Sequence, residues 1–439
     1  MRIALVNSRQ DKAGLNIRHH IGQLLDEGGA GGWQVPGRTY AFYDVEERLI
    51  HAEAIDREIE ADLLVFLSRH SSVNPVPVLT VHVTGNYGAA ELGGEARTLA
   101  PAAPAMMQAT LRALARHCPE GYRVSYEVTH HGPTSLSIPS FFVEIGSTEK
   151  EWGDPVAGRA VAEAVLSAAP VNAIPLIGIG GTHYAPRETE IALTSRGAFG
   201  HIASSLRQVS ALDTEMVQEM IRQSGAVAAY IDRKSLSRPE LERLTGIFES
   251  LEIPRLSESE IAAMGTVAWG TYRTVRKMAD AITPGARCYI HALEGAGTPV
   301  LVKANPVLIA ETVKSDEPGF IKNLDNLPLV HISTHDNCLL PEFITYTHHS
   351  PEIINDLNTL CVKIIRSKEI TATEKDNLII TKVRFDPHKA REQGIVPGPS
   401  YRELAGGRPV TIDGRTITPD MVSSRSEIRI HIPGLEKFS

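Results

Sequence analysis

About the first 280 residues of this 439-residue sequence predict an α/β fold, in which helices cover both faces of a mostly parallel sheet. Short apolar runs of strand length alternate along this part with stretches whose apolar residues recur at helical spacing. Helix start signals precede two of the helical stretches, at Asp213 and at Ser237. Strands that alternate with helices run parallel, because each helix returns the chain to the edge of the sheet from which it left.

The predicted strands are apolar runs, and the predicted helices carry apolar residues three and four positions apart. The strand candidates are 2–7, 61–68, 78–83, 123–129, 141–145, 173–179 and 226–231. The helix candidates are 105–117, 156–169, 214–224 with Asp213 as N-cap, and a helix opened by Ser237-Arg-Pro-Glu. Glycines at 28–32 and prolines at 75 and 77 indicate loops.

From about residue 285 the sequence changes to longer polar stretches with Asn and Asp clusters, which predicts a C-terminal α+β extension. We expect a catalytic domain over 1–284, an extension over 285–380 and a small basic module over 381–439. Residues 381–415 contain seven Lys or Arg against four Asp or Glu, within a chain whose net charge is −8. An acidic protein that binds a nucleic acid needs such a local basic surface.

The composition is that of a globular protein, with 42% hydrophobic and 22% charged residues. No run approaches the roughly 18–20 apolar residues that cross a bilayer, and the first residues lack the pattern of a signal peptide. We therefore expect a cytoplasmic monomer without membrane contact or an obligate protein partner. The four cysteines form no Cys-x-x-Cys pair, which excludes a Cys-rich zinc site and argues against a disulfide framework.

Residues that can carry chemistry gather at the ends of the predicted strands or inside them. They are His70, His82, His130, His131, Glu144 and His183. Ligands of open α/β sheets bind beyond the carboxyl ends of the strands. Most of these side chains fall there, so we expect one site assembled from several loops.

Each of these residues also has a structural explanation. A histidine in an apolar strand is commonly a hydrogen-bonded core residue. Adjacent strand residues point to opposite faces, so we expect only one of His130 and His131 to enter the site unless the strand has already ended. Glu144 lies in the apolar run Phe141-Phe-Val-Glu-Ile, and burying an unpaired ion costs several kcal/mol. Glu144 must therefore meet a metal, a cation or a proton.

The glycines of Ile177-Gly-Ile-Gly-Gly-Thr-His permit a substrate to approach backbone N–H groups, and a simple tight turn is the alternative. Thr84-Gly-Asn-Tyr has the same two explanations. His and Glu are the usual ligands of a catalytic zinc, but no His-Glu-x-x-His helix is present. The residues by themselves therefore predict a metal-dependent or an acid–base hydrolase.

Six segments, taken in order, resemble the archaeal and plant type of D-aminoacyl-tRNA deacylase over about residues 1–280. They are Phe66-Leu-Ser-Arg-His, Leu79-Thr-Val-His-Val-Thr-Gly-Asn-Tyr, Glu127-Val-Thr-His-His-Gly-Pro-Thr, Phe142-Val-Glu-Ile-Gly-Ser-Thr-Glu-Lys-Glu-Trp, Ile179-Gly-Gly-Thr-His-Tyr-Ala-Pro-Arg and Ala198-Phe-Gly-His-Ile. The resemblance implies a phosphorylase/hydrolase-like three-layer sandwich with a mostly parallel mixed sheet. It also implies zinc-dependent hydrolysis of the ester that joins a D-amino acid to the terminal ribose of tRNA, as a step of proofreading and D-amino acid catabolism.

In that chemistry, zinc would lower the pKa of its bound water toward 7, and the water would attack the ester carbonyl. The candidate zinc ligands are His82, His130, Glu144 and His183, and the candidate acid–base groups are Glu144, His131 and His183. The candidate substrate-binding residues are Arg69, Asn86, Gly180, Gly181 and Thr182. Backbone N–H groups of the turn 178–182 are expected to stabilise the oxyanion. Glycyl-tRNA is a further expected substrate, because glycine lacks the substituent by which an L-aminoacyl group is excluded.

The end of the chain, from Gly394-Ile-Val-Pro-Gly-Pro-Ser-Tyr onward, resembles a short segment of ribonuclease Z proteins. The His-x-His-x-Asp-His motif of that class is absent, so the resemblance implies no nuclease activity. It leaves open a tRNA-contacting element or a structural strand pair. Two other functions remain as alternatives: an aminopeptidase-like or nucleoside-cleaving hydrolase, and a non-catalytic RNA-binding protein that uses the basic block.

Overall fold

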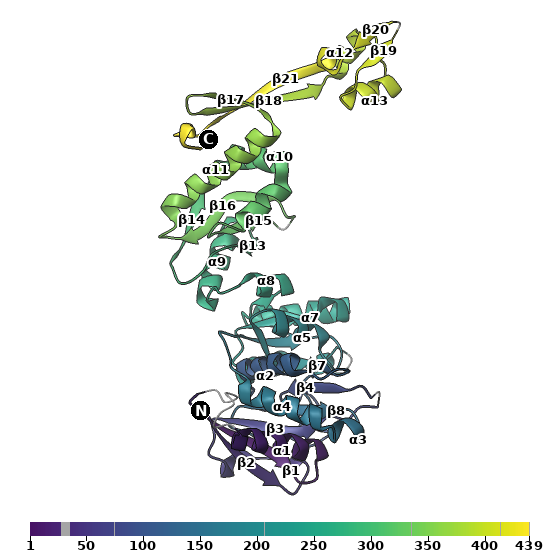
Figure 1. Ribbon diagram of the computed structural model, residues 1–439, viewed down its shortest axis with the longest axis vertical. Coiled ribbons are helices and arrows are strands. Elements are labelled where there is room, and N and C mark those ends of the chain that lie inside the picture. Colours follow the sequence, from purple (N-terminus) through teal and green to yellow (C-terminus); the bar gives the residue numbers. More distant parts are fainter. Residues whose placement is uncertain (28–35, 74, 206, 335, 413, 439) are drawn as a thin grey trace. The chain divides into compact units, whose positions relative to one another are not determined.

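The computed structural model describes residues 1–27, 36–73, 75–205, 207–334, 336–412 and 414–438 (Figure 1). Within these residues the chain forms two compact units, Met1–Gly265 and Thr266–Ser439. The loop predicted at 28–32 lies outside the described residues. In the described part of the chain, no helix has the length and apolar character needed to span a membrane.

The larger sheet of the first unit has six strands in the order β2-β1-β3-β8-β4-β7. They are β1 (Arg2–Ser8), β2 (Thr39–Val45), β3 (Leu63–Arg69), β4 (Val78–His82), β7 (Arg123–Tyr126) and β8 (Ser140–Gly146). Neighbouring strands are parallel except β4 and β8, which are antiparallel. Helices α1 (Lys12–Glu27), α4 (Pro155–Ser167) and α2 (Pro104–His117) pack in a row along this sheet (Figure 1). The α/β class with a mostly parallel central sheet is therefore confirmed.

A second sheet of four parallel strands holds the strands predicted at 173–179 and 226–231. Its order is β10-β9-β11-β12, with β9 (Ile174–Ile179), β10 (Gly197–Ala203), β11 (Ala228–Ile231) and β12 (Arg255–Leu256). Helices α6 (Thr214–Ser224) and α7 (Arg238–Ser250) cover the face that carries Ile177 and Ile179. Helix α5 (Pro186–Thr194) covers the opposite face, over Gly178. Asp213 and Ser237 cap α6 and α7, as predicted.

A short segment that follows β7 joins the two sheets. The strand predicted to reach residue 129 ends at Tyr126, because the next three N–H groups donate in different directions. The N–H of Glu127 donates to Val81 of β4, whereas the N–H of Thr129 donates to Ile202 of β10. Between them, the N–H of Val128 donates to His183, beyond the end of β9. The residues around this crossing therefore come from both sheets.

The second unit contains an antiparallel sheet in the order β13-β15-β16-β14. Its strands are β13 (Arg287–Ile290), β14 (Pro299–Lys303), β15 (Val330–Ser333) and β16 (Leu339–Tyr346), and its long helices are α9 (Trp269–Ile282), α10 (Pro306–Leu324) and α11 (Ser350–Lys368). Helix α9 packs on β13 and β14, so that the chain divides at residue 265, whereas we predicted a boundary at 284.

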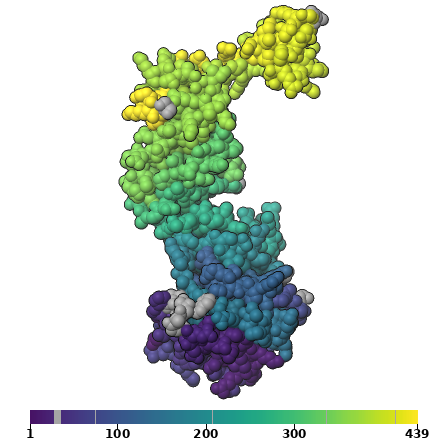
Figure 2. Space-filling model, viewed as in Figure 1, coloured from purple at the N-terminus to yellow at the C-terminus, as the bar shows by residue number. Residues whose placement is uncertain are grey.

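A long hairpin ends the second unit and carries a small subdomain at its tip. Strands β18 (Asn377–Phe385) and β21 (Ser423–His431) pair along their whole length beside β17 (Ile370–Glu374). We call residues 386–422 the hairpin tip; it contains α12 (Pro387–Glu392), α13 (Pro399–Ala405), β19 (Val410–Ile412) and β20 (Arg415–Ile417). Ala390, Ile395, Leu404, Ile417 and Val422 form its own core. Figure 2 shows the tip, in yellow, projecting from the rest of its unit.

The residues of the predicted module 381–439 divide between two cores. The hairpin tip has its own, whereas Ile430, Ile432, Leu435 and Phe438 pack into the core built on α10 and α11. We call the rest of the second unit its body, and Lys382 of β18 belongs to this body. Its Nζ lies 2.6 Å from Glu369 Oε1 and 3.4 Å from Glu311 Oε2, and its side chain is only 16% exposed.

We predict that Lys382→Ala lowers the free energy of unfolding of the second unit by about 1–3 kcal/mol, because the buried Glu311 then keeps only the exposed Lys314 as a partner. Arg429→Ala is the matched control, since Arg429 lies on the paired strand β21 and its ion pairs are solvent-exposed. Such pairs contribute about 0–1 kcal/mol. Urea unfolding of the full chain, followed by circular dichroism, measures both variants, and equal decreases would contradict the prediction.

Candidate metal centre and active site

Seven ionisable side chains converge where the first sheet meets the crossing segment. They are His70, His82, Glu127, His130, His131, Glu144 and His183. His70 follows β3, His82 ends β4 and His183 follows β9, so three of them lie at carboxyl ends of strands. Because β4 runs antiparallel to β8, and therefore to β3, the carboxyl ends of β3 and β4 point to opposite edges of the sheet, whereas the prediction assumed one shared edge.

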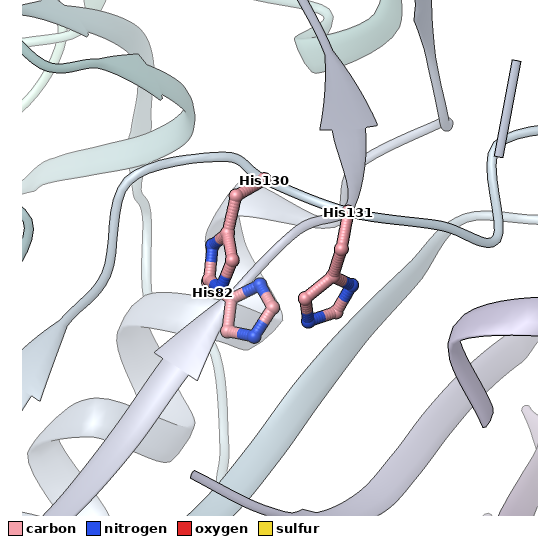
Figure 3. A group of neighbouring side chains, drawn as sticks. All are labelled: His82, His130 and His131. Atoms are coloured by element: carbon pink, nitrogen blue, oxygen red, sulfur yellow. The ribbon is translucent and has the colours of Figure 1, made fainter. Parts of the chain in front are cut away.

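His82, His130 and His131 form one cluster, which Figure 3 shows in close-up. The ring centroid of His130 lies 4.4 Å from those of both His82 and His131, and one ligand nitrogen of each ring lies within 4.8 Å of the others. Both adjacent histidines lie in this cluster, which is the exception that we allowed for a strand that has already ended. The strand has ended at Tyr126, and His131 has a positive φ of 47°, so the alternation of strand side chains no longer applies.

Backbone carbonyls fix the orientation of these three rings. Nδ1 of His82 donates to Val83 O at 3.3 Å, Nδ1 of His130 donates to Val128 O at 2.7 Å, and Nδ1 of His131 donates to Gly132 O at 2.6 Å. A carbonyl oxygen can only accept, so each Nδ1 carries a proton, and in a neutral ring Nε2 presents a lone pair. The buried Nε2 of His82 has no hydrogen-bond partner among the described residues. This arrangement is typical of metal-binding histidines.

Two buried carboxylates adjoin this cluster. Glu144 Oε2 lies 3.6 Å from His82 Nε2 and 3.7 Å from His70 Nδ1. Glu127 Oε2 lies 2.8 Å from His183 Nε2 and 3.6 Å from His130 Nε2, and Glu127 Oε1 lies 3.0 Å from His70 Nδ1. The two glutamates, Glu127 and Glu144, are only 1% and 3% exposed, so their charges must be balanced inside the site.

The environment keeps the carboxylates ionised. Burial would raise the pKa of Glu127, but hydrogen bonds from His183 and His70 outweigh it and hold that pKa well below its ordinary value. The pKa of Glu144 is also lowered, because His70 and His82 outweigh burial. Burial lowers the pKa of His70 less than Glu127 and Glu144 raise it, to about 11, so His70 is a cation. Without a metal, protonated His70 balances the charge of the two carboxylates; together with Glu127 and His183 it also forms a second group of side chains that could hold a metal ion.

The three histidines of the cluster differ in the direction of their pKa shifts. Burial, together with the neighbouring histidines, lowers the pKa of His130 well below its ordinary value and that of His131 to about 3, so both rings are neutral. The pKa of His82 is raised, because Glu144 and Glu127 outweigh its burial. A cation beside His82 and Glu144 is thus favoured, either as a proton or as a metal ion. Nitrogen and carboxylate donors of this kind suit zinc.

The five predicted substrate-binding residues do not all face this centre. The Arg69 guanidinium lies over the Trp152 ring, 5.1 Å from its centroid. The Asn86 side-chain amide donates to the carbonyls of Gly93 and Glu95. Thr182 is exposed and precedes His183.

The predicted oxyanion role of Gly180 and Gly181 disagrees with the structure. The N–H of Gly180 donates to Ala203 O at 2.8 Å, and the N–H of Gly181 donates to Ser235 Oγ at 2.7 Å. Both groups are already used in holding the turn to its neighbours, so neither can donate to a substrate oxygen.

Reasoning from the sequence missed one residue of the centre, Glu127, and did not recognise the role of a second, His70. Glu127 follows an apolar strand and could have been found by the argument applied to Glu144. His70 was noticed at a strand end, but nothing in the sequence showed that it would lie between two carboxylates. Its position depends on Trp152, whose Nε1 donates to His70 O at 2.9 Å, and on Tyr184, whose hydroxyl lies 3.0 Å from His70 Nε2.

The sequence pattern of a family described as D-aminoacyl-tRNA deacylase matches residues 57–256, which contain the whole centre. A protein of Methanoregula boonei named D-aminoacyl-tRNA deacylase is 64% identical over 439 residues, covering 100% of both chains. The extension is therefore shared by full-length relatives. A protein of Methanosarcina mazei with the same name is 36% identical over 279 residues, which cover 59% of this chain and 93% of that protein.

A solved structure described as a conserved protein of unknown function is also similar. It has a TM-score of 0.54 and 32% sequence identity, and the match covers 60% of this chain and 96% of that one. The match to the family pattern across the centre, together with relatives of the same name along the full length, shows that the chain belongs to the D-aminoacyl-tRNA deacylase family.

Proposed function

We propose that the protein hydrolyses the ester bond of D-aminoacyl-tRNA, and of glycyl-tRNA, to release the free amino acid and intact tRNA. One observation carries this proposal: a centre of neutral histidines and ionised carboxylates lies inside the part of the chain that matches the deacylase family. Such a donor set suits hydrolysis of a carboxylic ester, in which a water must be deprotonated and a carbonyl polarised.

Zinc is the metal that we infer for this centre, with Nε2 of His82, His130 and His131 as its ligands. One ligand nitrogen of each ring lies within 4.8 Å of the others, and the unsatisfied, buried Nε2 of His82 supports a missing partner at this place. Three histidines leave one position open for water or substrate, as in other catalytic zinc sites. When bound, zinc would supply a water of lowered pKa and would polarise the ester carbonyl.

His183 moves the proton in the proposed reaction. Its side chain is 43% exposed, and Glu127 Oε2 accepts a hydrogen bond from its Nε2 at 2.8 Å. Because Nε2 carries the proton of the hydrogen bond to Glu127, Nδ1 is the ring nitrogen that has a free lone pair. Nδ1 accepts a proton from the attacking water and returns it to the ribose oxygen that leaves with the tRNA. One water is consumed, and one acid and one alcohol are formed.

The hairpin tip is proposed to contact tRNA phosphates. Arg391, Arg402, Arg408 and Arg415 are exposed there, and the protein needs a local basic surface because its net charge is −8. Lys382 does not belong to this surface, since its ammonium group is paired with Glu311 and Glu369. The catalytic chemistry lies in the other unit, so the tip should influence tRNA binding alone.

We predict that a strong chelator abolishes ester hydrolysis and that added zinc restores it. The assay measures release of D-tyrosine from D-tyrosyl-tRNA, with L-tyrosyl-tRNA as the control substrate. Full activity in a preparation that mass spectrometry verifies to be free of metal would contradict the zinc proposal. Hydrolysis of free D-aminoacyl esters at the same kcat/KM would favour the alternative small-molecule hydrolase.

The zinc content of purified variants distinguishes zinc ligands from acid–base groups. His131→Asn should abolish zinc binding and activity together, because one of three ligands is removed. His183→Asn should retain zinc while kcat falls by about 10²-fold or more, because only proton transfer is impaired. His331→Asn is the control, since His331 is buried in the second unit, where its Nδ1 lies 2.6 Å from His291 Nε2. Absence of zinc from His183→Asn would make His183 a ligand instead.

We predict that Glu144→Gln lowers kcat by about 10²-fold or more while the fold survives. Its zinc content then shows whether Glu144 is a further ligand or an acid–base group. Glu163→Gln is a suitable control, because Glu163 is a partly buried carboxylate that pairs with His117 and Arg159 away from the centre. A near-normal rate for Glu144→Gln would make Glu144 a structural residue.

Removing the hairpin tip should raise KM for D-aminoacyl-tRNA without changing the single-turnover rate at saturation. Because Phe385 and Ser423 are register partners, residues 386–422 can be replaced by an Asn-Gly turn that keeps β18 and β21 paired. The logarithm of the binding constant falls linearly with the logarithm of the salt concentration. The slope of this dependence should become shallower by about one unit for every tRNA phosphate that the shortened protein no longer neutralises. An unchanged affinity and slope would exclude the tip as a tRNA-binding element.

Two double variants that each remove two positive charges test the tip without deleting it. The double variant Arg391→Gln, Arg402→Gln removes two charges from the tip, and Arg429→Gln, Lys437→Gln removes two exposed charges from the body of the same unit. Only the first pair should weaken tRNA binding.

A further inference from the structure

A second polar site lies in the smaller sheet of the first unit, at the carboxyl ends of β9 and β11. The chain runs from β9 to β10 on one side, then returns to β11 and β12 on the other, so its direction reverses between β9 and β11. Open parallel sheets bind ligands beyond the strand ends at such a switch point. Gly180 and Gly181 follow β9 here, and Asp232 follows β11.

Glu188 enters this site from the first turn of α5. It is 0% exposed, and neither of its carboxylate oxygens has a hydrogen-bond partner among the described residues. Its side chain lies over β9, where a Cβ added to Gly178 would come within 2.9 Å of Glu188 Cγ. Burial of an unpaired carboxylate is costly, so this group requires a partner.

The carboxylates of Glu188 and Asp232 converge on the space beside Gly181. A Cβ built on Gly181 would have Glu188 Oε2 and Asp232 Oδ2 at 3.9 Å each, and no other described atom within 4 Å apart from its chain neighbours. No ion pair joins either carboxylate to a basic side chain in the described residues. The adjacent Arg187 is instead paired with Glu258 at 3.5 Å, on the surface.

We propose that this space binds one hard divalent cation, such as Mg²⁺ or Ca²⁺, held by the carboxylates of Glu188 and Asp232. Two carboxylates match the charge of one such ion, and oxygen donors are those that hard cations prefer. The site is chemically distinct from the histidine centre, whose nitrogen donors favour zinc.

The electrostatics of the site agree with a cation. Burial raises the pKa of Glu188 to about 8, and the nearby charge of Asp232 adds to this. Burial also raises the pKa of Tyr230, and the charges of Glu188 and Asp232 raise it further. With a pKa of about 8, the Glu188 carboxyl group holds a proton at neutral pH, and a bound cation would take the place of that proton. It would also hold the turn that carries His183, because Gly181 precedes His183 by two residues.

The test is calorimetric titration of the full chain with Ca²⁺ and with Mg²⁺, after the histidine centre has been saturated with zinc. The expected result is saturable binding of one ion per chain. Glu188→Gln and Asp232→Asn should each weaken it by at least about 10-fold, whereas Glu190→Gln should not. Glu190 is the matched control, because it lies on the exposed side of the same helix.

Thermal unfolding provides a second readout that does not involve activity. Ca²⁺ in excess should raise the unfolding midpoint of the parent protein by about 3 °C or more and leave that of Glu188→Gln unchanged. The proposal is overturned if the parent binds neither ion, or if both variants bind as the parent does. Should Glu188→Gln fail to fold, Asp232→Asn decides alone, because Asp232 is only partly buried.

Discussion

The site depends on one crossing of the backbone, from the first sheet of the first unit to the second. At Glu127 the chain still bonds to β4, and two residues later it bonds to β10. This crossing brings His183 of the second sheet within 2.8 Å of Glu127 and places His130 and His131 against His82. Had β7 continued beside β4, the regular alternation of a strand would have separated the two adjacent histidines.

Charge balance explains why these side chains can be buried together. Two carboxylates in an apolar interior would each take up a proton if they were alone. Here the protonated His70 lies between them, His183 bonds to Glu127, and the three cluster histidines are held by backbone carbonyls through Nδ1, which leaves their Nε2 atoms for a cation. The structure thus holds negative charge and free lone pairs in one place, which is the condition for binding a metal cation.

The two units divide the requirements of an enzyme that acts on a macromolecule. The matched family region and the ionisable centre lie in the first unit, whereas the exposed arginines of the hairpin tip lie in the second. The tip stays folded on the long hairpin because it has its own core, while the residues after β21 return to the core of the body. A deletion that starts at residue 381 would therefore remove part of that body core as well as the tip.

The sequence by itself determined the α/β class, the helix caps at Asp213 and Ser237, and most residues of the centre, because these depend on local periodicity and on residue type. Only the tertiary structure decided that the strands form two sheets, that both His130 and His131 enter the site, that Glu127 joins them, and that His70 lies between the two carboxylates. It also decided that the N–H groups of Gly180 and Gly181 are already bonded. Each of these outcomes depends on hydrogen bonds between residues far apart in the chain, and no local pattern encodes the partner of such a bond.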